Sequence, residues 1–212
     1  MSLAGPPGPA WLGLVRHGEP NVPPGTFVGQ LDPPLSPAGR ADAAALAAAL
    51  GGWRGARILS SDLRRAAETA TALAAVVGGR LELDPRWREI ALGAWEGWDW
   101  ARLERCAPEA AAAYLRDHRP PEAPGGEPRA ALAARVTAAL AAAPPEPGGR
   151  LLVVTHLGPI RHLLALCLRL DPVAAERLRV DRGSLTVLAR FPDGARLDAL
   201  NWRPGPPPGG RP

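Results

Sequence analysis

The chain has 212 residues, of which 46% are hydrophobic and 22% charged, as is typical of a globular domain of about 100–200 residues with short extensions. No apolar run approaches the ~20 residues that a membrane span needs, so we expect no membrane partner. The formal net charge is +4, yet the sequence pI is about 10.3 because every basic residue is Arg. Arg stays charged to above pH ~12 and is dispersed among Asp, Glu and Ala, so this pI does not indicate nucleic-acid binding.

The cysteines and the chain ends indicate in which compartment the protein is expected and where its domain begins and ends. Cys106 and Cys167 form no CxxC motif, so the sequence predicts neither a disulfide framework nor a structural zinc site. Residues 1–10 do not resemble a signal peptide, and a cytoplasmic location is the simplest expectation. Both Pro/Gly-rich ends, 1–10 and 203–212, should be flexible, which leaves one domain over 11–202.

Short apolar runs alternate with helical periodicity along this domain. In chain order the pattern predicts a strand at 11–15, a helix from Ser36-Pro37 to about 50, a strand at 57–60, a helix over 63–77, a strand at 81–83, an Ala-rich helix near 108–117, a helix around 132–140, a strand at 151–155, a helix that includes 158–167, and a hairpin of 185–190 and 196–200. This alternation indicates an α/β fold, a three-layer sandwich with a mostly parallel central sheet and helices on both faces. Residues 90–127 should form a small inserted cap.

Chemically reactive side chains follow the predicted strands. Arg16 and His17 end the first strand, His156 ends the strand at 151–155, and Glu89 follows the third strand. The turn after the second strand, residues 60–65, ends in two arginines. Because ligands bind at the carboxyl ends of parallel strands, we expect these groups to converge on one rim of the sheet.

This set of side chains favours phosphoryl transfer through a covalent histidine. Arg presents planar donors to a phosphate dianion, and a helix that starts near Gly158 adds N–H groups. A neutral imidazole can attack phosphorus, while a carboxyl group protonates the leaving oxygen and then activates water. Guanidinium groups can stabilise the charge, so we expect no metal and no other cofactor. The chain also lacks a Gly-rich loop ending in Lys, which disfavours nucleotide-driven transfer.

Five segments carry a family resemblance: LVRHGEP at 14–20, SSDLRRAAETA at 60–70, WREIALGAWEG at 87–97, PGGE at 124–127 and VVTHLGPIR at 153–161. Together they resemble the histidine phosphatase superfamily, which has the phosphoglycerate-mutase-like fold. The likeness covers roughly residues 11–201. Within the family, the chain resembles the phosphatase branch that includes α-ribazole phosphatase.

The resemblance implies roles for individual residues. His17 would be the phosphorylated nucleophile, and Glu89 the proton donor. The phosphoryl oxygens would be held by Arg16, Arg65 and His156. Substrate contacts would come from Arg16, Asn21, Gly29, Arg65, His156, Leu157 and Gly158. Glu19 would be a carboxylate that supports the first motif from behind.

Three features depart from the family pattern. Leu157 stands where the family commonly has Gly, and Pro128 stands where Ser or Thr usually follows the GGE element. The first loop is rich in Pro, so Asn21 is only a near match to the Asn that is frequent there.

Some assignments stay open on the residues alone. Periodicity does not decide which of Arg64 and Arg65 faces phosphate, although the resemblance favours Arg65. Glu96 is a weaker candidate for the role of Glu89. His162, six residues after His156, is expected to be structural.

Two further groups of residues have simple explanations. We expect His118 to be a solvated loop residue. The tryptophans Trp87, Trp95, Trp98 and Trp100 should mostly pack the cap onto the sheet, with one or two of them lining the pocket.

The sequence therefore predicts a metal-independent phosphomonoesterase that hydrolyses a small phosphorylated metabolite through a phosphohistidine, as a monomer or homodimer. The short segment between Glu89 and His156 favours this activity over a cofactor-dependent phosphoglycerate mutase. A non-catalytic phosphate-binding protein is the alternative from another class, and the complete set of reactive residues argues against it. α-Ribazole 5′-phosphate, sugar phosphates and phosphoglycerate all remain possible substrates.

Overall fold

The computed structural model describes residues 8–117 and 121–204, which contain six strands and seven α-helices. The strands are β1 (Ala10–Arg16), β2 (Arg57–Ser60), β3 (Leu81–Leu83), β4 (Arg150–Thr155), β5 (Leu185–Phe191) and β6 (Gly194–Trp202). The helices are α1 (Pro37–Ala49), α2 (Arg64–Val77), α3 (Trp100–Cys106), α4 (Pro108–Asp117), α5 (Arg129–Ala142), α6 (Leu157–Leu168) and α7 (Pro172–Glu176). Single 3₁₀ turns lie at Gly51–Trp53, Pro85–Trp87 and Gly93–Trp95.

The strands form one sheet in the order β3-β2-β4-β1-β5-β6. Strand β4 pairs in parallel with both β1 and β2, and β3 pairs in parallel with β2. The hairpin β5–β6 adds two antiparallel strands beside β1. Since β1, β2 and β4 run in the same direction, their carboxyl ends meet at one edge of the sheet, where the reactive residues follow them.

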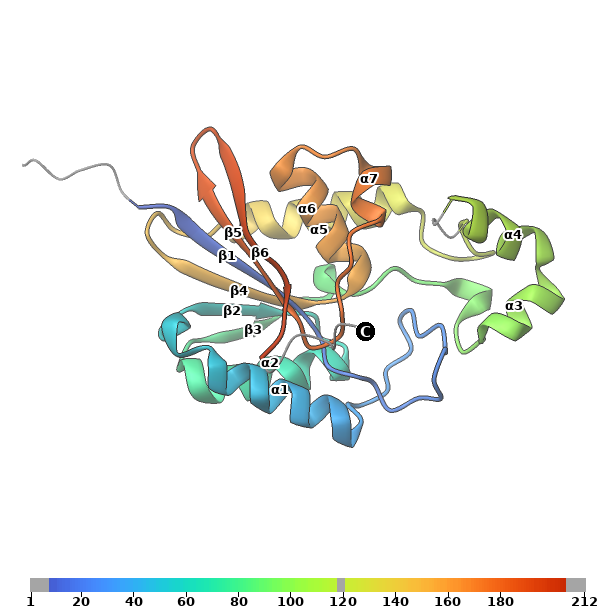
Figure 1. Cartoon of the computed structure of the whole chain (residues 1–212), viewed down its shortest axis with the longest axis horizontal. Helices are drawn as coiled ribbons and strands as arrows, with labels where there is room; N and C mark the ends of the chain where they lie inside the picture. The colour runs from blue at the N-terminus through green and yellow to red at the C-terminus, as the bar shows by residue number, and fades with distance from the viewer. Residues whose placement is uncertain (1–7, 118–120, 205–212) are drawn as a thin grey trace, which may run out of the picture.

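Helices cover both faces of the sheet (Figure 1). On one face α1 and α2 bury Leu46 and Leu73 against Ile58 and Val154. On the opposite face α5 and α6 pack on the strands through a second buried cluster that includes Val136. The central strands β1 and β4 are buried on both faces, which is why they read as continuous apolar runs. The predicted three-layer α/β sandwich is confirmed.

The segment before α5 forms a lobe at the end of the sheet, where Figure 1 shows α3 and α4 away from the strands. It has a small apolar core of its own, in which Trp95, Leu103 and Ala111 are buried. The prediction of one Ala-rich helix in this cap was incomplete, because α3 precedes α4. A helix of only seven residues with a single buried side chain, Leu103, gives little periodicity to detect.

Local chemistry explains where the helices begin and end. The Ser36 hydroxyl accepts the N–H of Gly39, and Pro37 opens α1, as the cap signal predicts. Helix α2 ends at Gly78, which adopts a left-handed φ of 71° that a residue with a side chain rarely takes. Asp99 caps α3 by accepting the N–H of Arg102.

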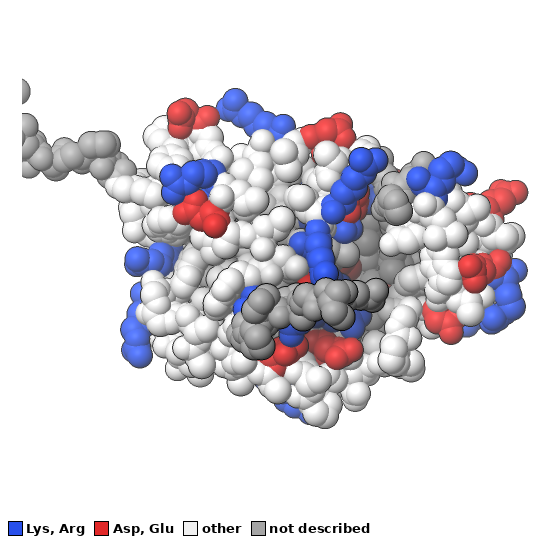
Figure 2. Space-filling model, viewed as in Figure 1, with Lys and Arg blue, Asp and Glu red and all other residues white. Residues whose placement is uncertain are grey.

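The ends of the chain lie mostly outside the described residues. Of the expected flexible segment 1–10 only residues 8–10 are described, and Ala10 already belongs to β1. Of the segment 203–212 only 203 and 204 are described, and His118 also falls outside. Within the described part of the chain, no helix is long and apolar enough to span a bilayer. Acidic and basic side chains are interspersed over the face drawn in Figure 2.

Candidate active site

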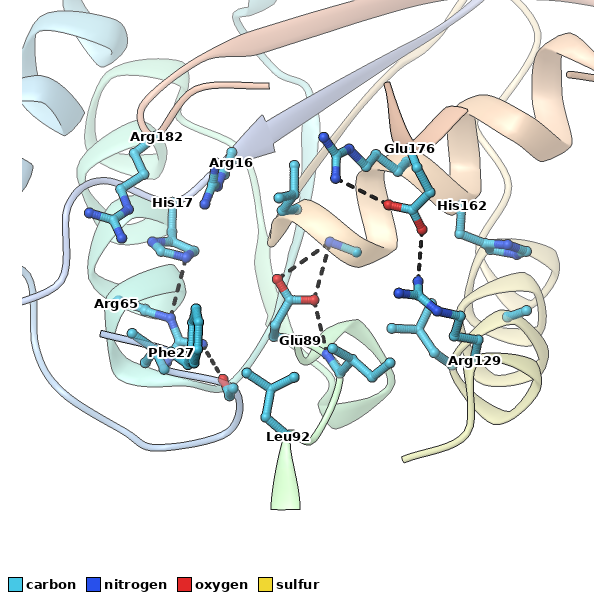
Figure 3. Close-up of a pocket in the computed structure, with 18 of the residues that line it drawn as sticks. Arg16, His17, Phe27, Arg65, Glu89, Leu92, Arg129, His162, Glu176 and Arg182 are labelled. Atoms are coloured by element: carbon cyan, nitrogen blue, oxygen red, sulfur yellow. Dashed lines mark hydrogen bonds and ion pairs between the residues drawn. The ribbon is translucent and has the colours of Figure 1, made fainter. Parts of the chain in front are cut away.

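A cavity of about 510 Å³ lies at the carboxyl edge of the sheet, beside the cap. Figure 3 shows side chains that line it, polar ones together with apolar ones such as Phe27 and Leu92. Of the residues expected to bind substrate or take part in chemistry, the cavity wall includes Arg16, His17, Gly29, Arg65, Glu89, Leu157 and Gly158. His156 lies directly behind His17, with ring centroids 4.8 Å apart. The tertiary structure thus brings together groups that are as far apart in sequence as His17 and Gly158.

His17 follows the last residue of β1, and its ring is held by two hydrogen bonds. Nδ1 lies 2.6 Å from the carbonyl oxygen of Gly18, and a carbonyl can only accept, so Nδ1 carries the proton. Arg65 Nε donates to Nε2 at 3.3 Å. The hydrogen bonds therefore assign the neutral tautomer whose lone pair is on Nε2.

Burial keeps this imidazole neutral. His17 is 5% exposed, and desolvation, followed by the positive charges of Arg65 and Arg16, holds the pKa of its side chain well below the usual value. Its Nε2 is consequently unprotonated at neutral pH, as a nucleophile requires, and attack on phosphorus replaces the long hydrogen bond that its lone pair accepts from Arg65.

The two arginines at the start of α2 point in different directions. Arg65 is 1% exposed, and besides His17 it contacts two carbonyl oxygens, those of Gly29 and Leu31, each at 2.6 Å. Arg64 is exposed and pairs with Glu68 at 3.7 Å on the outer side of the helix. The structure thus places Arg65 in the cavity and Arg64 outside it.

Arg16 is also desolvated. Its Nη1 donates to the carbonyl of Val180 at 2.6 Å, and its buried Nε has no hydrogen-bond partner among the described residues. Desolvation lowers the pKa of Arg16 to about 10, and the nearby Glu89 opposes that shift. The pKa of Arg65 is likewise lowered to about 10 by burial. Both remain cations near neutrality and are poorly hydrated, so an incoming dianion pays a reduced cost for displacing water from them.

His156 directly follows β4 and is fully buried. Its Nε2 lies 2.9 Å from the hydroxyl of Ser61, in the turn after β2, and its Nδ1 has no partner among the described residues. Burial and the proximity of His17 hold the pKa of His156 well below its usual value. Ser61 accepts the N–H of Leu63 and also orients this histidine.

Glu89 approaches the first turn of α6. Its Oε1 accepts the N–H groups of Ile90 at 2.9 Å and Gly158 at 3.1 Å, whereas Oε2 lies 3.4 Å from Gly158 N. A Cβ at position 158 would lie 2.5 Å from Oε1, so only glycine permits this approach. The main chain at Glu89 is fixed by Gln30 and Arg135, which both donate to its carbonyl at 3.0 Å.

Glu96, the weaker candidate for the acid, is not among the residues that line the cavity. Its Oε1 accepts the N–H of Gln30 at 2.8 Å and that of Leu92 at 3.1 Å. It therefore joins the cap to the loop whose carbonyls hold Arg65. Gly29 in that loop has a φ of 50°, and a Cβ there would lie 2.4 Å from Glu96 Oε1.

Some of the expected contacts lie elsewhere. Asn21 is exposed and does not line the cavity, and neither does any of the four tryptophans between 87 and 100. Trp87 instead is completely buried against the sheet and α5. Pro128 occupies the position before the first residue of α5.

Sequence reasoning missed several residues of the wall. Arg182 lines the cavity, and its Nη1 lies 3.3 Å from Oε1 of Glu19, the carboxylate expected to support the first motif. Arg129, Arg161 and Glu176 also line it. Arg161 ends the segment VVTHLGPIR, but no motif marks Arg129, Glu176 or Arg182, which the packing of α5, α7 and the segment before β5 brings to the cavity.

His162 was expected to be structural. It lines the cavity, and its Nε2 lies 2.8 Å from the hydroxyl of Thr137. Burial lowers the pKa of this histidine. In Figure 3 it lies beside Glu176 and away from His17, so it belongs to the opposite end of the cavity.

No group of three or more metal-ligating side chains is found among residues 8–117 and 121–204. What the pocket does hold is a neutral histidine, buried guanidinium groups and a carboxylate at a helix terminus. These can bind a tetrahedral anion and exchange a proton with it.

Comparisons with known proteins agree with this geometry. The glucosyl-3-phosphoglycerate phosphatase of Mycobacterium tuberculosis is 36% identical over 206 residues, which cover 91% of each chain. A solved structure of a mycobacterial glucosyl-3-phosphoglycerate phosphatase with VO3 has a TM-score of 0.78 and 36% identity, and the match covers 91% of this chain and 99% of that one. A putative α-ribazole-5′-P phosphatase from Escherichia coli has a TM-score of 0.78 and 28% identity, with 92% and 97% covered.

The sequence pattern of the histidine phosphatase superfamily (branch 1) matches residues 12–203. This match spans the cap and all of the sheet except the first two residues of β1. The chain belongs to the histidine phosphatase superfamily.

Proposed function

We propose that the protein is a phosphoric monoester hydrolase that transfers the phosphoryl group of a small metabolite to His17 Nε2 and then to water. The observation that carries the proposal is the orientation of His17. Nδ1 donates its proton in a hydrogen bond to the carbonyl of Gly18, so the lone pair is on Nε2, beside Arg65. Relatives that match most of the chain are phosphatases as well.

In the first half-reaction Nε2 forms a bond to phosphorus while the ester oxygen leaves with the bonding electron pair. Arg16 and Arg65 donate to the equatorial oxygens, whose charge grows as the transition state forms. His156 adds a donor through Nδ1 when Ser61 donates its hydroxyl to Nε2. The proton stays on His17 Nδ1 and is donated to the carbonyl of Gly18, which stabilises the positive charge that the ring gains.

Glu89 serves both half-reactions. Its Oε2 makes only the longer contact to Gly158, so this oxygen is available to protonate the leaving alkoxide. After the alcohol departs, the resulting carboxylate removes a proton from a water molecule that attacks the phosphohistidine. The products are the alcohol and inorganic phosphate, with His17 and Glu89 restored to their initial states.

The test is hydrolysis of p-nitrophenyl phosphate in EDTA by the wild type, followed by labelling with a phosphoester that carries ³²P. We expect steady release of phosphate and a label that acid removes and alkali does not, as a phosphoramidate behaves. A protein that only binds phosphate would give neither.

A second assay separates hydrolysis from isomerisation. With 3-phosphoglycerate, in the presence and absence of 2,3-bisphosphoglycerate, a hydrolase releases inorganic phosphate. Rapid formation of the 2-isomer with negligible phosphate release would instead identify a mutase and contradict the proposal.

A further inference from the structure

Arg182 lies at the rim of the phosphate end of the cavity, by which we mean the part lined by Arg16, His17 and Arg65. In Figure 3 its guanidinium group lies beside the ring of His17, and Glu89 lies on the other side of that ring. Burial is the main cause of the lowered pKa of each of the three lining side chains, and the positive charge of Arg182 adds to it in every case. Arg182 is therefore close to the whole phosphate end, yet the reaction described above gives it no role.

The turn over residues 180–184 carries this arginine and is bonded directly to the residues that bind phosphate. The N–H of Gly183 donates to the carbonyl oxygens of Arg16 and His17, both at 3.0 Å. At the other end of the turn, the carbonyl of Val180 accepts Nη1 of Arg16 at 2.6 Å. The main chain of the turn is thus fixed relative to the phosphate end.

The outer side of the same turn is fixed by β6. The N–H of Asp181 donates to Asn201 Oδ1 at 2.6 Å, and Asn201 Nδ2 donates to Asp181 Oδ2 at 3.0 Å. Asn201 has a φ of 56°, a left-handed conformation that residues other than glycine adopt rarely. Such a conformation persists only where the surrounding contacts enforce it. The turn is therefore a rigid support for the side chain that it carries.

The side chain of Arg182 is held much less tightly than its main chain. It is 34% exposed, and its Nη1 lies 3.3 Å from Oε1 of Glu19, whose side chain is 45% exposed. An exposed ion pair of this kind contributes little to stability. Arg16 and Arg65, by contrast, are fixed by main-chain carbonyls. Arg182 can therefore exchange Glu19 for an anion that enters the cavity.

A phosphoryl group has acceptor capacity for a third guanidinium. Three of the five N–H groups of Arg65 already have acceptors, which are Nε2 of His17 and two carbonyl oxygens. Arg16 likewise donates to a carbonyl. A phosphate dianion carries more charge than the Glu19 carboxylate and has three strong acceptor oxygens, which match the planar donors of Arg. An entering phosphate is consequently the stronger partner for the guanidinium at the rim.

From these observations we infer that Arg182 is a third phosphate-binding guanidinium, which leaves Glu19 and contacts the phosphoryl group once the substrate is bound. Because Glu89 lies on the other side of His17, this contact is made to an oxygen that stays on phosphorus and not to the leaving oxygen. The inference rests on the phosphate site of the proposed function and adds a residue to it. The contact should help every phosphoester in the same proportion, whatever alcohol it carries.

The experiment measures phosphate binding and turnover separately in the full-length protein. Titration calorimetry with inorganic phosphate gives Kd, and assays with p-nitrophenyl phosphate and an alkyl phosphate give kcat/KM. For Arg182→Gln we expect Kd to rise about tenfold and kcat/KM to fall about tenfold on both esters, as for the loss of one hydrogen bond to a charged group. An unchanged Tm shows that the variant is folded. Binding and turnover equal to those of the wild type would overturn the inference.

A conservative variant and a matched control accompany this measurement. Arg182→Lys keeps the charge and loses the planar pair of donors, so its Kd should fall between those of the wild type and Arg182→Gln. Arg179→Gln removes the same charge three residues earlier, from a side chain that is 71% exposed and does not line the cavity. Its Kd for phosphate should stay within about twofold of the wild type. A tenfold loss in this control as well would contradict a specific contact by Arg182.

Salt separates a contact from a charge that acts at a distance. At about 0.5 M KCl, interactions through solvent between separated charges are largely screened. A direct hydrogen bond to phosphate persists, so the ratio of Kd between Arg182→Gln and the wild type should remain close to its low-salt value. Disappearance of the difference at this salt concentration would contradict the contact.

Glu19→Gln tests the exchange of partners. Loss of the Glu19 charge releases Arg182, so phosphate should bind up to about fivefold more tightly. The gain should be absent when Arg182→Gln is also present, because Glu19 then has no guanidinium to withhold. Weaker binding in the single variant, or an equal gain in both backgrounds, would contradict the exchange.

The outcomes separate this inference from the proposed function. Phosphate binding that depends on Arg182, in a protein that turns over no phosphoester, would support the inference and contradict the phosphatase activity. Turnover that Arg182→Gln leaves at the wild-type rate, with unchanged phosphate binding, would support the phosphatase activity and contradict the inference.

Discussion

The two ends of the cavity are built differently. At the phosphate end, side chains are nearly inaccessible and their contacts are to main-chain carbonyls, as for Arg65 with Gly29 and Leu31. At the opposite end, beside α7, partly exposed side chains contact one another: Arg129 and Arg161 both pair with Glu176.

This difference has a physical reason. A carbonyl belongs to the backbone and stays where the fold puts it, so a guanidinium held by carbonyls is rigid and cannot be retuned by replacing one side chain. A side-chain ion pair is adjustable, because a single substitution changes its charge and shape. Transition-state stabilisation needs the first kind of construction, whereas selection among substrates can use the second.

The strongest test of this contrast is His17→Ala. It removes the nucleophile, so we expect turnover of every phosphoester to fall on the order of 10⁴-fold or more, together with loss of the acid-labile label. Initial-rate assays on a sugar-bearing and a sugar-free ester measure the effect. Retention of wild-type rates would require another nucleophile.

Glu89→Gln should separate substrates by their leaving group. General acid catalysis contributes about 10²–10⁴-fold, and a poor leaving group depends on it most. We therefore expect a large loss with alkyl phosphates and a smaller loss with p-nitrophenyl phosphate, whose phenolate leaves without a proton. Equal losses on both would exclude Glu89 as the proton donor and leave it a structural role at α6.

Arg65→Ala and Arg64→Ala form a matched pair of neighbours. Loss of one donor to a transferring oxyanion reduces the rate about 10²–10³-fold, which we expect for Arg65→Ala. Arg64 is exposed with only a long contact to Glu68, so Arg64→Ala should change the rate by less than about twofold. The measurement is kcat/KM with p-nitrophenyl phosphate, and the opposite order would contradict the assignment of Arg65.

Glu96→Ala tests whether the cap supports the phosphate end. Without Glu96 the loop at Gln30 loses an acceptor, and the carbonyls that orient Arg65 are less constrained. We expect inhibition by inorganic phosphate to weaken by roughly tenfold, as for loss of one hydrogen bond to a charged group. Glu104→Ala, an exposed position on α3, is the control and should leave inhibition unchanged.

The smallest expected effect is on stability at acidic pH. Burial lowers the pKa of His17. It also lowers the pKa of His162, which is less buried and lies at the opposite end of the cavity. Below the unfolded-state pKa of about 6.5, the unfolded chain binds a proton that the folded imidazole refuses, so stability falls as the pH falls. Each such group can contribute up to about 1.4 kcal/mol per pH unit.

Thermal melting of two variants between pH 7.5 and 5 measures how much each histidine contributes to the decrease in Tm with falling pH. His17→Asn should flatten the acid-induced decrease in Tm more than His162→Asn does, because His17 is the more deeply buried. Equal slopes in the wild type and His17→Asn would show that His17 titrates normally in the folded state.

Much of the phosphate end could be predicted from the sequence. The buried strands β1 and β4 are continuous apolar runs that His17 and His156 follow directly, and Glu89 comes after β3 and the 3₁₀ turn at Pro85–Trp87. Parallel strands place their carboxyl ends at the same edge, so adjacency in sequence to a strand end implies adjacency in space. The predicted convergence of these residues is therefore a consequence of topology.

Where topology alone was insufficient, the prediction was incomplete. Arg64 and Arg65 are consecutive on one helix, so strand ends place both near the site, and only the docking of α2 decides which one turns inward. Asn21 lies in a loop without periodicity, and the path of that loop leaves its side chain exposed.

The sequence by itself determined the α/β layers, the rim of the sheet that carries the chemistry and the residue types that perform it, because these depend on local periodicity and on the direction of strands. Only the tertiary structure decided which nitrogen of His17 carries the proton and that Arg65 turns inward. It also decided that Glu96 contacts the loop that holds Arg65, and that Glu176 pairs with Arg129 and Arg161. These depend on contacts between segments distant in the chain, such as α5 with α7 through Arg129 and Glu176. No local pattern encodes such contacts, since the packing of complete elements sets which side chains meet.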